Sequence, residues 1–369
     1  MPAPATHSPT VLWWSRSGRE YSRNRIVRDS FLRLGWTLVD FAPLVSLTAD
    51  LEASLRRLPT PDLVWVPCFR QRDGAAAVRW SRRRGSPVVF DPLISAYDKQ
   101  VFERQKFAET SRSARRLKQW EAALMRRFDR VIADTDCHAA FFYEEFGVPT
   151  SALCVIPVGA EQGLFTSQAA GVNTGPVRVM FYGSFIGLQG PEVIAAAARL
   201  TPELDWTLIG DGPLKSRCVD IAGDARNVRF IPWIPYEDLP AAIGVAEILL
   251  GVFGESRKAG RVIPNKVFQS LACARLVVTR PSSAYPSELV NAGLAGSGLS
   301  FIEAGQPERL ASELRELAAH RNELAAALGL QARQSYERYF SESSIDQAAA
   351  GRAAIVGAAD SPSRRQDGD

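Results

Sequence analysis

Short apolar runs alternate along this chain with stretches in which apolar residues recur every three or four positions. The runs predict buried strands, and the recurring positions predict helices with one buried face. In the first half, strands are expected at Thr10–Trp14, Thr37–Phe41, Leu63–Val66, Val88–Phe90, the start of Arg130–Asp136, and Cys154–Pro157. In the second half, they are expected at Val177–Tyr182, Trp206–Gly212, Val228–Phe230, Leu249–Phe253, Leu276–Thr279 and Leu299–Glu303. This alternation predicts an α/β protein with parallel sheets.

Helices are expected at Ile26–Leu34, Asp50–Leu58, Val101–Arg130, His138–Phe146, Glu192–Leu200, Glu237–Gly244, from Pro264, at Glu308–Gly329 and at Gln331–Phe340. Thr166–Pro176 is small, polar and broken by glycine, so it predicts a linker. The linker divides the chain into domains at 1–165 and 177–340. Residues 357–369 are expected to form a disordered tail.

The stretch Leu249–Thr279 carries the clearest candidate site. It reads as a strand, a basic loop, a helix that begins at Pro264, and a second strand. In such a parallel crossover, ligands bind at the carboxyl ends of the strands. Lys258, Arg261 and Lys266 fall there, and three cations beside a helix amino terminus suit a phosphate or diphosphate. The alternative is a solvated basic loop.

Composition limits the classes of function. The chain has 369 residues, 46% of them hydrophobic, and a formal net charge of only +4, with its basic residues dispersed, which disfavours nucleic-acid binding. Its five cysteines show no metal or disulfide spacing, as expected for reduced cytosolic thiols. No signal peptide or membrane-spanning run is visible. We therefore expect a cytoplasmic protein, with peripheral membrane contact left open.

Other candidate residues follow strands of the first domain. Gly18 and Arg19 lie in an arginine-bearing loop after the first strand, which is either a binding loop or a solvated one. Asp91 follows Val88–Phe90 directly, so it is either a residue of the active cleft or a turn cap. His138 begins a helix, and we expect an exposed capping residue there in preference to a catalytic one.

In the second domain, a glycine-rich turn follows the first strand. Gly183 and Ser184 begin this turn, whose free backbone N–H groups are suited to a phosphate. Trp233 follows a later strand and either stacks on a nucleotide base or packs within the protein.

The stretch Val101–Arg130 is rich in arginine and lysine. A charged helix of this kind usually faces water. The alternative is a face that rests on anionic lipid headgroups, which would suit an enzyme with a lipid-linked acceptor.

The segment IPNKVFQSLACARLVVT, at Ile263–Thr279, resembles the signature region of family-four glycosyltransferases. These are retaining enzymes with two Rossmann-like domains, the GT-B fold. The variant that it most resembles reads roughly R-x-I-P-N-K-x-[FY]-E-x-L-A. The resemblance also covers the end of the first domain and the closing pattern Tyr336–Ser341. It implies a final helix, at about 341–356, that crosses back onto the first domain.

The chain departs from the family at two glutamates. Gln269 stands where relatives hold the ribose hydroxyls with glutamate, and Arg261 stands where the sugar-contacting glutamate belongs. Gln269 retains hydrogen-bonding capacity, so ribose contact is still expected, whereas the sugar contact is not carried over to Arg261. Glu255 could substitute for it. Ser184 and Gln189 occupy positions where relatives often carry cations.

The resemblance implies a retaining glycosyltransferase that uses a nucleotide-diphosphate sugar and a hydroxyl acceptor, with no cofactor or metal. We expect Lys258, Arg261, Lys266 and Asp91 to be catalytic, Gly183, Ser184, Trp233, Ile263, Pro264 and Gln269 to bind the donor, and Gly18 and Arg19 to lie on the acceptor side. A sugar-nucleotide epimerase and a non-catalytic nucleotide-sugar-binding protein remain as alternatives.

Overall fold

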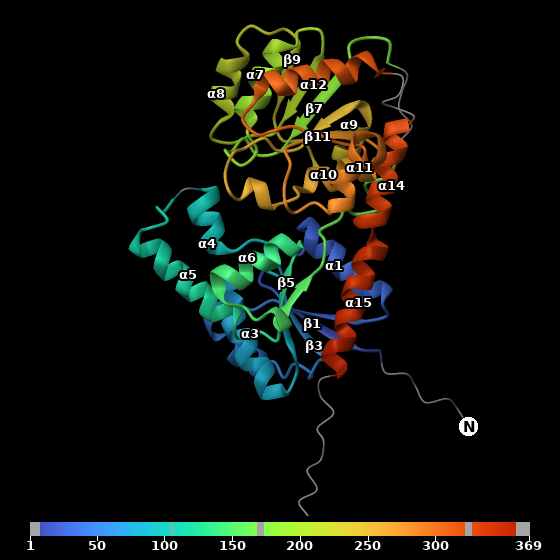
Figure 1. Cartoon of the computed structure of the whole chain (residues 1–369). Coiled ribbons are helices and arrows are strands. Elements are labelled where there is room, and N and C mark those ends of the chain that lie inside the picture. The colour runs from blue at the N-terminus through green and yellow to red at the C-terminus, as the bar shows by residue number, and fades with distance from the viewer. Residues whose placement is uncertain (1–7, 105, 168–172, 322–326, 359–369) are drawn as a thin grey trace, which may run out of the picture.

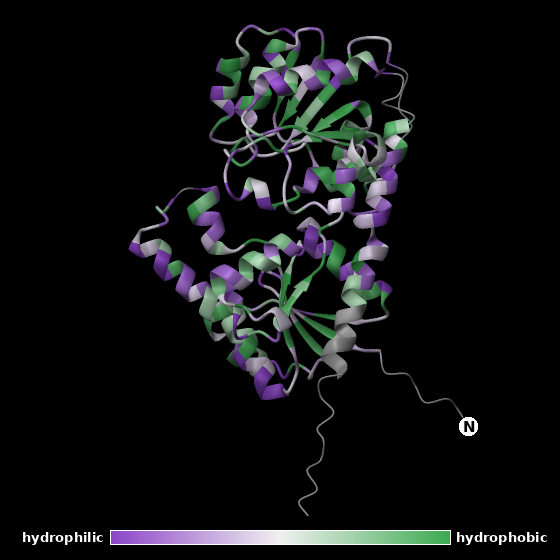
Figure 2. Ribbon diagram, viewed as in Figure 1, coloured by the Kyte–Doolittle hydropathy of each residue, from purple (hydrophilic) through white to green (hydrophobic). Residues whose placement is uncertain are grey.

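The computed structural model describes residues 8–104, 106–167, 173–321 and 327–358. Two α/β domains face each other, and two helices of the C-terminal part run along one side of both (Figure 1). Apolar side chains fill the strands, while polar ones coat the outer faces of the helices (Figure 2). The expected pair of Rossmann-like domains is confirmed. The middle of the expected linker, residues 168–172, and most of the expected tail, residues 359–369, lie outside the described residues.

The first domain contains a parallel six-stranded sheet in the order β2-β1-β3-β4-β5-β6. Its strands are β1 (Thr10–Trp14), β2 (Thr37–Phe41), β3 (Leu63–Val66), β4 (Val88–Phe90), β5 (Arg130–Ala133) and β6 (Leu153–Val155). Its helices are α1 (Ser22–Arg33), η1 (Ser46–Thr48), α2 (Ala49–Leu55), α3 (Gln71–Arg84), α4 (Ala96–Asp98), η2 (Lys99–Glu103), α5 (Arg112–Met125), α6 (Asp136–Phe146) and η3 (Thr150–Ala152). The inner strands are buried on both faces, which explains their continuous apolar runs.

The second domain repeats this design in the order β12-β11-β10-β7-β8-β9. Its strands are β7 (Arg178–Tyr182), β8 (Asp205–Ile209), β9 (Val228–Ile231), β10 (Ile248–Leu250), β11 (Leu276–Thr279) and β12 (Leu299–Phe301). Its helices are α7 (Pro191–Leu200), α8 (Lys215–Ala222), η4 (Tyr236–Asp238), α9 (Leu239–Val245), η5 (Ala259–Arg261), α10 (Asn265–Ala272), α11 (Ser287–Ser297), α12 (Pro307–Ala319) and α14 (Gly329–Tyr339). Both sheets therefore present the carboxyl ends of six parallel strands to a site.

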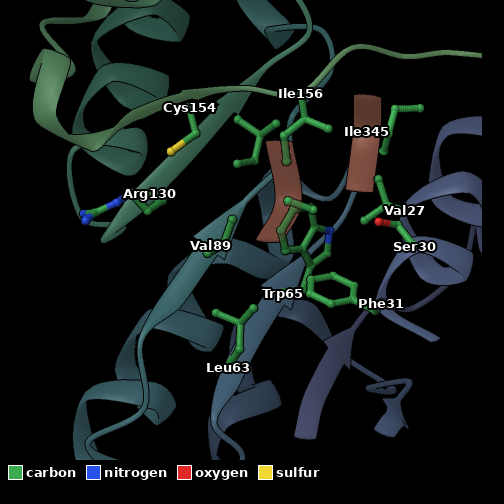
Figure 3. Close-up of a pocket in the computed structure, with 12 residues that line it drawn as sticks. Val27, Ser30, Phe31, Leu63, Trp65, Val89, Arg130, Cys154, Ile156 and Ile345 are labelled. Atoms are coloured by element: carbon green, nitrogen blue, oxygen red, sulfur yellow. The ribbon is translucent and has the colours of Figure 1, made fainter. Parts of the chain in front are cut away.

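The last helix, α15 (Glu342–Ala358), returns to the first domain. Ile345 is fully buried against α1 and the sheet, and Arg33 binds the Asp346 carboxylate at 2.8 Å. A small apolar cavity of about 30 Å³ remains beneath this helix, with Trp65 and Ile345 in its wall (Figure 3). The helix thus packs onto the face of the sheet that α1 only partly covers.

The two chain segments that cross between the domains touch each other. The Tyr336 hydroxyl donates to the Ala160 carbonyl at 2.9 Å, at the end of the first domain. Gly159 has φ of +69°, and a Cβ there would lie 2.6 Å from the Ile345 side chain. Glycine is therefore required where the outgoing and returning segments meet.

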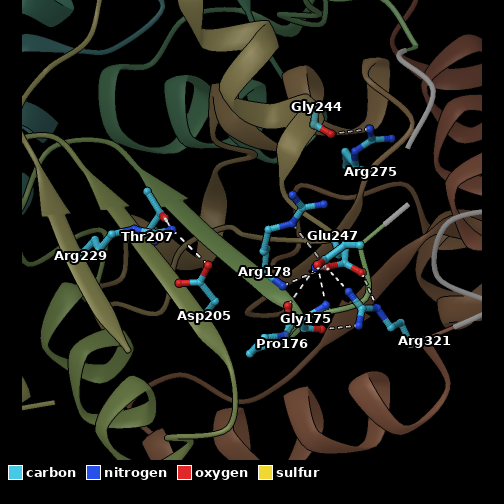
Figure 4. A network of polar contacts seen from close by, with 11 residues as sticks. Gly175, Pro176, Arg178, Asp205, Thr207, Arg229, Gly244, Glu247, Arg275 and Arg321 are labelled. Atoms are coloured by element: carbon cyan, nitrogen blue, oxygen red, sulfur yellow. Dashed lines mark hydrogen bonds and ion pairs between the residues drawn. The ribbon is translucent and has the colours of Figure 1, made fainter. Parts of the chain in front are cut away.

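The amino-terminal edge of the second sheet is held by a polar network around Glu247 (Figure 4). Its carboxylate accepts from Arg321 at 2.8 Å and from the Arg178 backbone N–H at 3.0 Å. Burial by itself would raise the pKa of Glu247, but these hydrogen bonds lower it on balance. Because ligands bind at the opposite edge of such a sheet, this network supports the fold and lies away from the candidate site.

Several regions differ from the expected helices, and α8 and α11 were not predicted. Val101–Arg130 is not one helix, because α5 begins only at Arg112, where the Ser111 side chain caps its first turn. Helix α3 was not predicted. Its packing depends on small residues, since a Cβ at Gly74 would lie 2.8 Å from the Phe128 ring, and such residues leave a weak apolar pattern. Residues 322–326 of the expected helix Glu308–Gly329 lie outside the described residues. Among the helices that are described, none is long and apolar enough to cross a membrane.

Candidate active site

Lys266 lies where the second domain brings α10 against its glycine-rich turn. Its ammonium group donates to the Gln189 Oε1 atom at 2.6 Å and lies 3.8 Å from the centre of the Phe181 ring. Gly183 has φ of +149°, which favours glycine, and a Cβ there would lie 2.9 Å from the same ammonium group. The turn and the first turn of α10, which are far apart in sequence, therefore share one site.

The charge on Lys266 is not neutralised by any residue that the structure describes. The residue is 5% exposed and forms no ion pair in the described part of the chain. Burial alone lowers the pKa of Lys266 well below its usual range. An anion bound beside the ammonium group would remove this cost, because a buried charge is stable only when it is paired.

Helix α10 starts one residue later than expected. Pro264 has an extended backbone and is the N-cap residue, so the first helical residue is Asn265. Ile263 is buried before it, and Ser184 lies half-buried in the glycine-rich turn. Asn265 lies beside the Tyr21 hydroxyl, whose pKa burial raises to about 12. The amino terminus of α10 thus points toward the first domain.

Lys258 and Arg261 do not join Lys266 around an anion. The Lys258 ammonium lies 3.3 Å from the Asp98 carboxylate and also binds Glu103. The Arg261 guanidinium lies 3.1 Å from Asp98 and stacks over the ring of Phe141. All three partners belong to the first domain. Of the three expected cations, Lys258 and Arg261 are therefore paired with carboxylates across the interface in this structure.

Gln269 lies on the buried face of α10. Its Oε1 atom accepts from the Tyr182 hydroxyl at 3.0 Å, and its Nε2 atom donates to the Tyr236 hydroxyl at 3.0 Å. Glu161 of the first domain accepts from Tyr236 in turn. Each end of the amide retains the capacity for one further hydrogen bond.

Asp91 lies at the end of β4 in a buried ion pair. Its carboxylate is 3.0 Å from the Nε atom of Arg23, which also binds the Pro157 carbonyl. Burial raises the pKa of Asp91, and Arg23 opposes that rise. Arg23 belongs to the arginine-bearing loop and α1, so this carboxylate anchors that segment to the sheet and does not face open solvent.

His138 is buried, and the expectation of an exposed capping residue is wrong. Its Nδ1 atom lies 2.6 Å from the Asp134 carboxylate, and Thr135 supplies the cap of α6. The neighbouring Cys137 thiol lies 3.1 Å from the Ser283 hydroxyl of the second domain. The histidine–aspartate pair therefore sits at the domain interface, beside the strand that carries Asp91.

Both halves of the chain match models of known protein families. Residues 4–159 match the family model of a glycosyl transferase 4-like domain. Residues 176–320 match that of the glycosyl transferases group 1. The chain belongs to a glycosyltransferase family. No curated protein matches it in sequence.

Solved structures share the GT-B fold of this glycosyltransferase. HepE of Anabaena in complex with UDP is 15% identical, with 94% of this chain and 100% of that chain covered and a TM-score of 0.71. A sucrose-phosphate synthase from Thermosynechococcus elongatus is 16% identical over 96% and 100%, with a TM-score of 0.74. The lipopolysaccharide outer core galactosyltransferase WaaB is 11% identical over 93% and 99%, with a TM-score of 0.61. At such identities the likeness concerns the fold.

The remaining predicted residues of the glycosyltransferase lie apart from Lys266. Arg19 is exposed and pairs with Asp40 at 3.2 Å. Gly18 has φ of +90°, and its carbonyl accepts from the Asn24 side chain at 2.6 Å. Trp233 lies just beyond β9 with 57% of its surface exposed, so it is not a core residue. No described contact brings these residues to the glycine-rich turn.

Sequence reasoning missed Asp98, Glu103 and Asp134, and it misjudged the surroundings of His138. Asp98 and Glu103 neutralise cations more than 150 positions away, a separation that no local pattern reveals. The pair Asp134 and His138 has i,i+4 spacing across the start of a helix. That spacing was visible in the sequence and could have identified the pair.

Proposed function

We propose that the protein is a retaining glycosyltransferase that moves a sugar from a nucleotide-diphosphate sugar to a hydroxyl acceptor. The observation that carries the proposal is the buried, unpaired Lys266 beside the glycine-rich turn, at the carboxyl edge of the second sheet. A diphosphate supplies the missing negative charge. HepE structures contain UDP and UDP-glucose, which makes UDP-glucose the first donor to test.

The chemistry follows from this placement. The bond between the sugar's anomeric carbon and the diphosphate breaks, and negative charge grows on the departing phosphate. Lys266, the free N–H groups at the start of α10 and those of the glycine-rich turn stabilise that charge where it develops. The acceptor oxygen forms the new bond on the same face of the sugar, and its proton passes to the leaving phosphate. No protein nucleophile is assigned.

The first domain supplies the other wall of the reaction site. Asp134 fixes the ring of His138 through Nδ1, and we place the Nε2 atom toward the sugar. Gln269 is proposed to keep a ribose contact through its remaining hydrogen-bonding capacity. Lys258 and Arg261 are proposed to act mainly as positioning residues that hold the domains together through Asp98.

Thermal-shift titration with UDP, GDP, ADP and TDP and their sugars tests donor binding, because a ligand of the native state raises its melting temperature. Product assays with and without acceptor then distinguish transfer from epimerisation. We expect one nucleotide series to bind wild type and not Lys266→Ala. Lys118→Ala is the control, since Lys118 pairs with Glu145 on the outside of the first domain. Equal binding by both variants would refute the assignment.

A further inference from the structure

A large groove of about 1510 Å³ crosses the first domain. All of its lining residues lie between positions 16 and 124. Its walls are the loop after β1, the turn η1, the loop between β3 and α3, the start of α3, and the helical segments α4, η2 and α5. Elements that are distant in sequence thus enclose one continuous depression on the acceptor-side domain.

The groove is positively charged. Five arginines and lysines line it, against one carboxylate, Asp73. Arg70 lies 3.8 Å from that carboxylate. The other four cations form no ion pair within the described ranges: Arg16, Arg72, Lys106 and Arg116. Nearby arginines that are structural look different, since Arg79 and Arg83 both bind Asp50. The unpaired set suits an anionic ligand.

One rim of the groove is apolar and exposed. Val45, Leu47 and Trp120 line the groove with 54%, 73% and 43% of their surface exposed. The same apolar strip continues with Leu44, Leu51 and Leu55. Helix α2 therefore turns its larger apolar residues outward and buries alanines. Such a strip beside cations is typical of a surface that rests on an anionic bilayer.

The groove also reaches the domain interface. Ala96 and Gln100 line it, while Asp98 and Glu103 of the same helical segment hold Lys258 of the second domain. The residues of η2 form a π-helical turn, a feature frequent at functional sites. The groove therefore borders the domain interface, where a head group at its inner end would meet a donor sugar held by the second domain.

We propose that this groove binds the acceptor, and that the acceptor is an anionic lipid in a bilayer whose head group carries hydroxyls. The inference rests on the proposed function and names its acceptor class. The strip at residues 44–55 enters the bilayer interface, and the four unpaired cations bind the phosphate of the head group. A soluble anionic sugar would leave the exposed leucines without a partner.

Asp73 is the residue that we expect to favour a head group with hydroxyls over one without them. Its side chain is 2% exposed, and neither carboxylate oxygen has a hydrogen-bond partner among the residues described. A buried carboxylate without a donor is costly. Asp73 belongs to the groove wall, so a rotation of its side chain would let a head-group hydroxyl donate to it. The Oε1 atom of Gln100, also in the wall, has no partner either.

Vesicle flotation of the full chain tests the proposal. We expect binding to phosphatidylcholine vesicles that contain phosphatidylglycerol, and weak binding to phosphatidylcholine alone. The double variant Arg72→Gln, Arg116→Gln should bind about 30-fold more weakly, at about fivefold per cation. Leu47→Asp with Leu55→Asp should weaken binding by about tenfold or more. Equal binding to neutral and anionic vesicles would overturn the proposal.

The matched control is Arg226→Gln with Val219→Asp, which changes an exposed arginine and an exposed valine of the second domain. It should bind vesicles as wild type does, and an equal loss would show that the effect is not local. Light scattering tests whether a second copy of the chain covers the apolar strip instead of a bilayer. If Leu47→Asp with Leu55→Asp converts a dimer to a monomer, the strip binds a second copy and the lipid proposal fails.

Phosphatidylmethanol tests the role of Asp73, because its head group carries the same single charge without hydroxyls. We expect about tenfold tighter binding to phosphatidylglycerol vesicles, and loss of that preference in Asp73→Asn. Equal binding of both lipids by the wild type would overturn the hydroxyl assignment. Thermal shifts with UDP separate the two proposals. Vesicle binding without any nucleotide binding refutes the proposed function, whereas nucleotide binding without vesicle binding refutes only this acceptor class.

Discussion

Two basic regions of the second domain lie within nine positions of each other and have opposite electrostatic surroundings. In the loop, Lys258 and Arg261 are neutralised by Asp98 and Glu103 from the other domain. At the helix start, Lys266 faces Gly183, an amide and an aromatic ring, with no carboxylate paired to it among the described residues. Two of these cations hold the protein together, and the third lacks a counter-ion.

The difference shows that the role of a cation depends on what faces it and not on its place in a motif. A paired cation contributes to a fixed domain arrangement, and breaking the pair leaves an isolated charge. An unpaired buried cation makes the free protein less stable, but it is ready for an anionic ligand. Changes at either region should therefore have opposite consequences for stability and activity.

The largest effect is expected from Lys266→Met. Turnover with the best nucleotide sugar should fall by about 10²- to 10³-fold, because the developing charge on the diphosphate loses its fixed partner. The free energy of unfolding should stay the same or rise, by up to about 2 kcal/mol, since a buried unpaired charge is removed. Steady-state kinetics and urea unfolding measure both. A marked loss of stability with full activity would reverse the comparison.

Asp98→Asn should have the opposite profile. It leaves both Lys258 and Arg261 without their shared carboxylate, so unfolding free energy should fall by about 3 kcal/mol. UDP binding should be retained in a thermal-shift titration. Asp205→Asn is the control, because its pair with Arg229 is solvent-exposed and should contribute less than about 1 kcal/mol. If Asp98→Asn is neutral and tightens UDP binding, the loop cations belong to the donor site.

The pH dependence of UDP binding should separate the two regions further. Burial lowers the pKa of Lys266 in the free protein, and a bound diphosphate raises it, so binding takes up a proton. Affinity should therefore be constant below the free-state pKa and fall as pH rises above it, by up to tenfold per pH unit. Calorimetry above pH 7 in two buffers of different ionisation enthalpy measures this uptake. Lys266→Met should lack this proton uptake on UDP binding.

Gln189→Lys should have the smallest effect. It places a second cation beside Lys266. UDP should bind about three- to tenfold more tightly, and the free protein should lose about 1 kcal/mol of stability through like-charge repulsion. Isothermal titration measures the affinity for UDP, and thermal unfolding measures the stability of the free protein. Weaker UDP binding would show that Gln189 itself contacts the donor.

The strands were predictable because inner parallel strands are buried on both faces. The inner strands β1, β3, β4 and β11 begin and end where their apolar runs do. The edge strand β2 also has its expected bounds, although it is only partly buried. Helix α3 escaped prediction because Gly74 lies on its buried face, where close contact with Phe128 replaces large side chains. The apolar run of a strand is local information, whereas the fit of a small residue depends on a distant neighbour.

The candidate site was predictable only in part. Lys266 and the glycine-rich turn could be placed together, because both lie at carboxyl ends of neighbouring strands, β7 and β10. The pairing of Lys258 and Arg261 could not be predicted, because it depends on Asp98 and Glu103 across the domain interface. Whether a charge is free is a property of the assembled molecule.

The contact between Gly159 and Ile345 has a mechanical consequence. Both chain segments that join the domains pass through one small area, pinned by Tyr336 and Ala160. Two connections set wide apart would resist opening, whereas two that lie together act as a single pivot. If the ion pairs of Lys258 with Asp98 and Glu103 broke, the domains could rotate about this point. A nucleotide could then enter or leave while the two domains stay connected.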